Sequence, residues 1–307
     1  MPFKIDRLRE LLAKIETTAG TAISVTGTDG TVPVMNVAYT DNTSYNRREN
    51  VTGGKLAGRR GPLIGTMSFD VEAMGLGTTG SVPAWADLFL PPCGFSKSTA
   101  TFTFQRLVAN QKTITLKHFI DGKYRQLYGA AGSCRLTYNA GNISRFSFNF
   151  TGIVSPIAET ANPAVTLVTT QPIVGAASFT YHNGTNPITL NAPSGVIDWG
   201  QTVAPIETPN AAGYLRFCVS DYNPIMTVEP YEEAVGSTAI DPDADWVANS
   251  ERAISLVLGS SANNTMTIAA SKATHSSAPS WGERQRLVTR GFNLDFNDDS
   301  APTIVFS

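Results

Sequence analysis

The segment Gly75–Gly80 has the glycine spacing of a dinucleotide-binding loop, G-x-G-x-x-G. Such a loop needs a buried parallel strand before it, a full helix after it, and an acidic residue about 20 positions on that binds the ribose. Here Asp70 and Glu72 interrupt the apolar residues of the preceding strand, and Pro91-Pro92 ends the following helix early. No acidic residue stands at the required distance, so we interpret these glycines as a connecting loop.

Other residues that could support catalysis or metal binding are isolated. The histidines lack the spacing of a zinc-binding helix, and no G-x-S-x-G nucleophile elbow is present. The segment Asp241–Trp246 resembles the start of a calcium loop, but Trp246 stands where that loop needs glycine. We interpret these aspartates as helix-capping residues. The sequence therefore predicts no enzyme activity, no cofactor and no metal site.

The composition favours a β-rich fold. Only 16% of the 307 residues are charged, and glycine and proline are frequent, which is typical of short strands joined by many turns. Cys93, Cys134 and Cys218 are far apart and form no C-x-x-C pair, so we expect reduced, buried thiols. No apolar run approaches the roughly 20 residues of a membrane span, and no signal peptide is apparent. We expect a chain made in a cytoplasm and not bound to a membrane.

Two further elements are expected in the first half. The apolar residues of the N-terminal segment recur at helical spacing, which predicts an amphipathic helix that ends at Thr17–Gly20. These residues are Ile5, Leu8, Leu11, Leu12 and Ile15. The basic, glycine-rich segment 47–61 has no aromatic residue for stacking on bases, and we interpret it as an extended inter-ring or inter-subunit arm. Its candidate contact residues are Arg47, Arg48, Gly53, Gly54, Lys55, Arg59 and Arg60.

Alternating apolar and polar residues predict antiparallel strands around Phe69–Ala73, Phe102–Phe104, Ile114–Leu116, Cys134–Tyr138 and Phe146–Phe150. Turns are expected at Asp121-Gly122 and Ala140–Asn142. The prolines of segment 152–172 favour a linker. We therefore divide the chain into a first β domain, residues 1–155, a linker, residues 156–172, and a second β domain, residues 173–307.

The second half repeats several patterns of the first, which predicts a diverged duplication. Met226–Glu229 matches Phe69–Glu72, and each is followed by a short acidic segment with one tryptophan, Trp85 or Trp246, that we assign to a structural helix. Gly291–Phe296 matches Ser144–Phe150, and Met266–Ala270 is matched to Cys134–Tyr138. The halves differ in charge: residues 1–155 carry 17 Lys and Arg against 10 Asp and Glu, whereas residues 156–307 carry 6 against 15. Net charges of +7 and −9 favour contacts between unlike halves of neighbouring subunits.

Several segments in this order resemble the major tail (tube) proteins of long-tailed bacteriophages. They are Leu11–Thr21, the strand, glycine and tryptophan run Met67–Phe89 closed by Pro91–Phe95, Asp121–Lys123, Gly129–Leu136 and Phe146–Gly152. The resemblance is best over residues 1–155 and implies a β-sandwich or half-barrel, here present as two tandem tail-tube-like domains, each with a short flanking helix.

The resemblance also implies a role and partners. Subunits of that family join their sheets into rings that stack into a hollow tube, through which genomic DNA passes without specific binding. A chain that carries the fold twice favours a trimeric ring with pseudo-sixfold symmetry, and a hexamer is the other possibility. The expected location is the virion tail, assembled in the bacterial cytoplasm, with tape measure, tail terminator and tail tip proteins as further partners. Because cations in the channel would slow DNA, we expect a neutral or acidic lumen.

Three alternatives stay open from the sequence. Another structural β protein of a virion, such as a tail tip, baseplate or capsid-decoration component, shares these features. A carbohydrate-binding β-sandwich would use the tryptophans Trp85, Trp199, Trp246 and Trp281 as stacking platforms. An enzyme is the least supported of the three, since the sequence shows no catalytic constellation.

Overall fold

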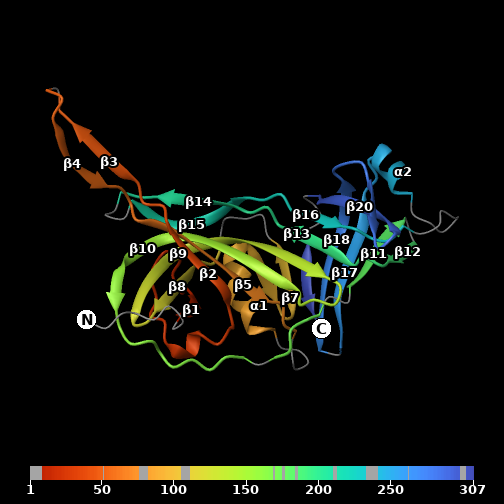
Figure 1. Ribbon diagram of the computed structural model, residues 1–307, viewed down its shortest axis with the longest axis horizontal. Helices are drawn as coiled ribbons and strands as arrows, with labels where there is room; N and C mark the ends of the chain where they lie inside the picture. The colour runs from red at the N-terminus through yellow and green to blue at the C-terminus, as the bar shows by residue number, and fades with distance from the viewer. Residues whose placement is uncertain are drawn as a thin grey trace.

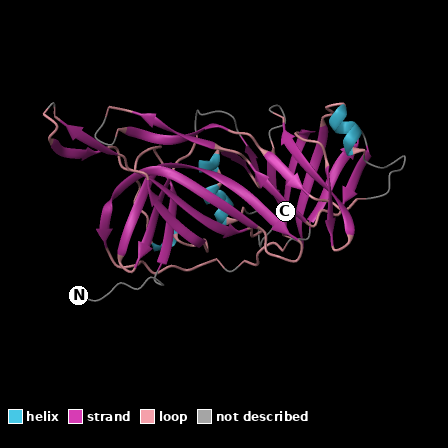
Figure 2. Cartoon of the chain, turned by 45° about the horizontal axis from the view of Figure 1, so that its top comes forward, coloured by secondary structure: helices cyan, strands magenta, loops and turns pink. Residues whose placement is uncertain are grey.

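The computed structural model describes residues 9–50, 52–75, 82–104, 111–168, 170–174, 177–183, 186–209, 213–232, 241–261, 263–297 and 302–307, and these residues form a mainly β molecule (Figures 1 and 2). Seventeen of the strands belong to one connected sheet, and the rest form two separate hairpins. All the strand pairs recorded for the described residues are antiparallel, as the alternating pattern predicts.

The strands of the first half are β1 (Arg9–Ile15), β2 (Met35–Asp41), β3 (Tyr45–Glu49), β4 (Lys55–Arg60), β5 (Ile64–Glu72), β6 (Phe95–Ser98), β7 (Thr101–Phe104), β8 (Ile114–Ile120), β9 (Lys123–Asn139) and β10 (Arg145–Glu159). Those of the second half are β11 (Ala177–Asn183), β12 (Asn186–Leu190), β13 (Ser194–Asp198), β14 (Thr202–Glu207), β15 (Tyr214–Asp221), β16 (Ile225–Val228), β17 (Arg252–Ser261), β18 (Asn264–His275), β19 (Ser280–Arg284), β20 (Leu287–Phe296) and β21 (Thr303–Phe306). The helices are α1 (Ala84–Phe89) and α2 (Pro242–Val247), with short 3-10 turns η1 (Gly27–Asp29) and η2 (Pro91–Cys93).

The two halves pair their strands in the same order. In the first half the order is β1-β8-β9-β10-β5-β2, and in the second it is β11-β17-β18-β20-β16-β13. Each half also has a separate hairpin, β3–β4 or β14–β15, inserted before the strand that leads to its helix. The sequence pattern thus has a counterpart in the topology.

Strand register agrees with most of the matched segments. Phe69 pairs with Phe148 in the first half, and Met226 pairs with Leu294 in the second. The match of Met266–Ala270 to Cys134–Tyr138 is wrong, because His275 is the partner of Leu294 just as Cys134 is the partner of Phe148. Bulges in β18 shift its residues relative to the apolar period.

Strands from the two halves also pair with each other. β13 of the second half pairs with β9, and β7 of the first half pairs with β21. The predicted linker, 156–172, begins too early, because β10 continues to Glu159 and pairs with β9 over Ala158 and Glu159. A Cβ at Gly152 would lie 2.7 Å from the Ala130 methyl, so the close approach of β10 to β9 at this point requires glycine.

The predicted N-terminal amphipathic helix is wrong over residues 9–15, which form strand β1 and pair with β8. Ile5 and Leu8 lie outside the described residues. Leu11 and Ala13 face the main core, while Leu12 faces a second cluster with Val25 and Phe119. A strand covered on both faces buries consecutive residues, and this imitates the apolar spacing of a helix.

Aromatic residues dominate the core where the halves meet. Trp85 of α1 packs on Phe146, with ring centroids 4.7 Å apart, and on Phe306 of the second half, with centroids 5.6 Å apart. Trp199, which follows β13, stacks on Phe146 at 5.9 Å. Helix α1 therefore lies inside the junction, whereas Figure 1 shows α2 at the opposite end of the molecule from the β3–β4 hairpin.

Candidate functional site

One sheet runs through both halves in the order β2-β5-β10-β9-β13-β16-β20-β18. Its register is continuous, so single rows of side chains cross the junction. One row points into the core: Val71, Phe146, Leu136, Ile197, Met226, Leu294 and His275.

The opposite face of this joined sheet, which we call the polar face, has two corresponding rows. The first is Asp70, Ser147, Arg135, Asp198, Ile225, Asp295 and Thr274. The second is Glu72, Arg145, Thr137, Val196, Thr227 and Asn293. Hydroxyl, amide and carboxylate groups thus form a nearly continuous strip across both halves.

Charges on the polar face are mixed and partly neutralised. The Asp70 carboxylate accepts hydrogen bonds from Asn36 Nδ2 at 2.7 Å and from Ser147 Oγ at 2.7 Å. Arg145 lies 4.0 Å from the Glu72 carboxylate. The two rows contain four carboxylates and two guanidinium groups, a net charge of −2. Such a surface hydrogen-bonds water and offers few fixed contacts to a polyanion.

The segment predicted to be an arm forms the β3–β4 hairpin, which projects from one end of the molecule (Figure 1). Arg47, Arg48, Lys55, Arg59 and Arg60 are all exposed. The tip turns at Gly53, whose φ of +77° favours glycine, and the Gly54 N–H donates to Asn50 Oδ1 at 2.7 Å. The structure thus brings the predicted arm residues together on one extended hairpin.

The corresponding hairpin of the second half, β14–β15, behaves differently. It lies over the first half, where Phe217 packs with Ala131 and Ile153. The Gln111 side chain donates to the Val219 carbonyl at 2.9 Å and accepts from the Val219 N–H at 2.8 Å. The amino-acid sequence alone does not indicate this contact. The apolar residues of segment Tyr214–Asp221 are the one feature of the sequence that could have predicted a packed strand here.

The two tryptophans assigned to helices lie in α1 and α2, in different surroundings. Trp85 is 1% exposed and its Nε1 donates to the Met74 carbonyl at 3.0 Å. Trp246 is 43% exposed, and its neighbour Val247 is 77% exposed. The helix that is enclosed at the junction in the first half therefore has an uncovered counterpart at the free end of the second.

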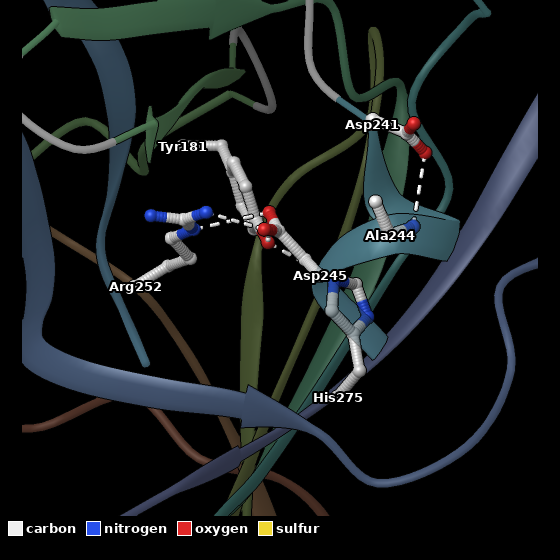
Figure 3. Close-up of polar contacts among 6 residues, drawn as sticks. All are labelled: Tyr181, Asp241, Ala244, Asp245, Arg252 and His275. Atoms are coloured by element: carbon white, nitrogen blue, oxygen red, sulfur yellow. Dashed lines mark hydrogen bonds and ion pairs between the residues drawn. The ribbon is translucent and has the colours of Figure 1, made fainter. Parts of the chain in front are cut away.

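Helix α2 is fixed to the sheet by a buried polar network (Figure 3). Asp241 caps the helix by accepting from the Ala244 N–H at 3.0 Å, which confirms the capping prediction for this residue, whereas Asp243 forms an ion pair with Arg290. Asp245 accepts from Tyr181 Oη at 2.8 Å and forms an ion pair with Arg252. The Tyr181 hydroxyl also lies 3.1 Å from His275 Nε2. Four elements, β11, α2, β17 and β18, meet in this network.

The network makes stability depend on pH. Burial lowers the pKa of His275 below its ordinary value, although the carboxylates of Asp245 and Asp243 oppose that shift. As the pH falls below about 6.5, the unfolded chain binds the proton before the folded chain does, so stability is lost. We expect the thermal midpoint to decrease from pH 7 to pH 5. His275→Gln should flatten this dependence; an unchanged slope in the variant would contradict the assignment.

Other predicted features have the following positions. β5 pairs antiparallel with β10, which excludes the parallel strand of a dinucleotide-binding loop, and Gly77 and Gly80 lie outside the described residues. The three cysteines are buried and unpaired, as predicted. Of the described residues, no cluster has the composition of a metal site, and no helix among them is long and apolar enough to cross a membrane.

The chain matches no known family model and no curated protein.

Proposed function

We propose that this chain is a structural virion protein that assembles into rings, and that stacked rings form the tail tube through which phage DNA is delivered. The observation that carries this proposal is the joined sheet with its polar face. The two halves share one topology and contribute adjacent strands to a single sheet. A sheet of repeated units that pair edge to edge can close into a ring.

The junction inside the chain provides a template for the contact between chains. Within the chain, β13 pairs with residues 135–139, directly after Cys134. The counterpart of β13 is β2, which pairs only with β5 among the described strands. The counterpart of residues 135–139 is the segment after His275. Placing β2 of one copy beside residues 276–280 of the next would repeat the junction and remove an open sheet edge.

This contact is heterologous, so repeated addition closes a ring when the rotation per copy divides a full turn. Three copies would place six similar halves around the axis, which is the pseudo-sixfold arrangement favoured by the duplicated pattern. The polar face would then line the channel, where hydroxyl and amide groups keep the wall wet and the mixed charges avoid strong phosphate binding. Tape measure, terminator and tip proteins are the expected partners of such a tube.

Imaging and mass together test the proposal. Negative-stain microscopy of the purified chain should show rings or tubes, and light scattering should give the ring number. A sample that stays monomeric over a wide range of concentration and salt would overturn the proposal, whereas discs or isolated fibres without a channel would favour another virion component.

The channel face has its own test. We expect Asn149→Cys, on the polar face, to react with a small maleimide in tubes but to be protected from a large polymer-linked maleimide. Leu167→Cys, exposed in the loop after β10, serves as the matched control and should react with both. Equal reaction of Asn149→Cys with both reagents in intact tubes would mean that the polar face does not line the channel.

A further inference from the structure

In the part of the chain that the structure describes, the strands of the β3–β4 hairpin are almost fully exposed, whereas the counterpart hairpin is packed. In the chain order of its half, each hairpin lies between the last strand of that half's pairing order, β2 or β13, and the next strand inward, β5 or β16. β14–β15 reaches from the second half back over the first half and buries Phe217 there. In contrast, every residue of β3 is exposed.

We infer that the β3–β4 hairpin of one copy lies on the second half of a neighbouring copy within the same ring, in the position that β14–β15 takes on the first half. This inference rests on the proposed ring and specifies one of its contacts. The neighbouring copy is required because the hairpin and α2 lie at opposite ends of the chain (Figures 1 and 2).

The shared topology identifies the residues that would meet. Arg216 of β15 precedes Met226 by ten residues, and Arg59 of β4 precedes Phe69 by ten residues. Arg216 Nη1 donates to the backbone carbonyl of Gln111 at 3.2 Å. Arg59 is therefore the counterpart of Arg216 and should meet the counterpart of Gln111.

That counterpart is acidic. Gln111 lies three residues before Ile114, the first buried isoleucine of β8, and Glu251 lies three residues before Ile254, the first buried isoleucine of β17. The Glu251 side chain is 48% exposed; its carboxylate accepts from Asn297 Nδ2 at 2.6 Å and lies 3.6 Å from Lys272 Nζ. An exposed carboxylate can accept a further bond from a guanidinium group.

Net charge favours the same arrangement. Segment 47–60 carries five basic residues and one acidic residue, a net charge of +4, and the second half carries −9. Unlike charges on facing surfaces steer association and fix the register of the partners. The structure thus assigns Arg59 and Glu251 as an ion pair between two copies of the chain.

Cross-linking tests the contact directly. The double variant Arg59→Cys with Glu251→Cys should form disulfides between chains on mild oxidation, since the natural cysteines are buried. Because each copy would link to the next around one ring, the ladder on a non-reducing gel should stop at the ring number. Lys55→Cys with Glu251→Cys is the matched control and should link poorly.

Two results would overturn the inference while leaving the ring intact: no cross-link in preparations that show rings, or a ladder that extends far beyond the ring number. The second result would place the hairpin between stacked rings instead. Absence of rings from the unmodified protein would refute the proposed function itself. Charge exchange gives a second readout: Arg59→Glu or Glu251→Arg alone should weaken assembly at least tenfold, and the two together should restore it.

Discussion

Glu16→Ala is expected to destabilise the fold by about 4 kcal/mol, which corresponds to a decrease of roughly 10 °C in the thermal midpoint. Glu16 follows β1 and is 3% exposed. Its Oε2 accepts from the Gly20 N–H at 2.8 Å and Thr113 Oγ1 at 2.6 Å, and its Oε1 accepts from Thr115 Oγ1 at 2.8 Å and the Gly129 N–H at 2.7 Å.

Removal of this carboxylate would take the acceptor from three donors, the Thr113 and Thr115 hydroxyls and the Gly129 N–H, at about 1–3 kcal/mol for each one that water cannot reach. The Gly20 N–H would keep only its bond to Thr113 Oγ1 at 3.2 Å. Glu16→Gln should cost less than Glu16→Ala, because one oxygen remains while the amide NH₂ faces two donors. Differential scanning calorimetry of both variants checks the order. The exposed Glu49→Ala is the control. A loss below about 1 kcal/mol for Glu16→Ala would show that Glu16 is not a main support of this region.

Trp246→Ala is expected to weaken assembly by about 100-fold while leaving the isolated chain folded. The reason is the comparison with α1, whose Trp85 is enclosed at the junction between halves. If the free end of one chain meets the next chain as the halves meet each other, Trp246 and Val247 become buried on assembly. Tryptophan is frequently a dominant contributor to such contacts.

Sedimentation velocity over a concentration series would measure the effect of Trp246→Ala, and Val247→Asp should act in the same direction. Leu167→Ala removes an exposed apolar residue from the loop after β10 and provides the control. If Trp246→Ala assembled at the same concentrations as the unmodified chain, the α2 end would be excluded from the interface. Unchanged thermal midpoints of the unassembled variants would separate this effect from misfolding.

Period-two patterns predicted much of the sheet. The strands around Phe69, Phe102, Cys134 and Phe146 form as expected, because each has one apolar face and one polar face. The helical spacing of apolar residues misassigned residues 9–15, where both faces of the strand are covered and the period-two alternation disappears. Local pattern does not distinguish a doubly covered strand from one face of a helix.

The hairpin contact and the polar face were harder to predict from the sequence than the strands. The basic composition of segment 47–61 predicted an arm, but nothing in it indicated a hairpin whose counterpart packs on the other half. The polar face depends on register across seven strand pairs, which brings Asp70 and Asp295 into one row although they are far apart in the chain. Register between distant strands is set by tertiary packing, so a single sequence does not display it.

The exchange of strands at the junction has a mechanical consequence. β13 of the second half pairs with β9, and β7 of the first half pairs with β21. Pulling the halves apart must therefore break backbone hydrogen bonds at both places together. Separation would leave β9 and β21 each without one of their paired strands. If the chains assemble as proposed, tension along the tube would load both strand pairs together, and the two halves of each chain would separate in a single step.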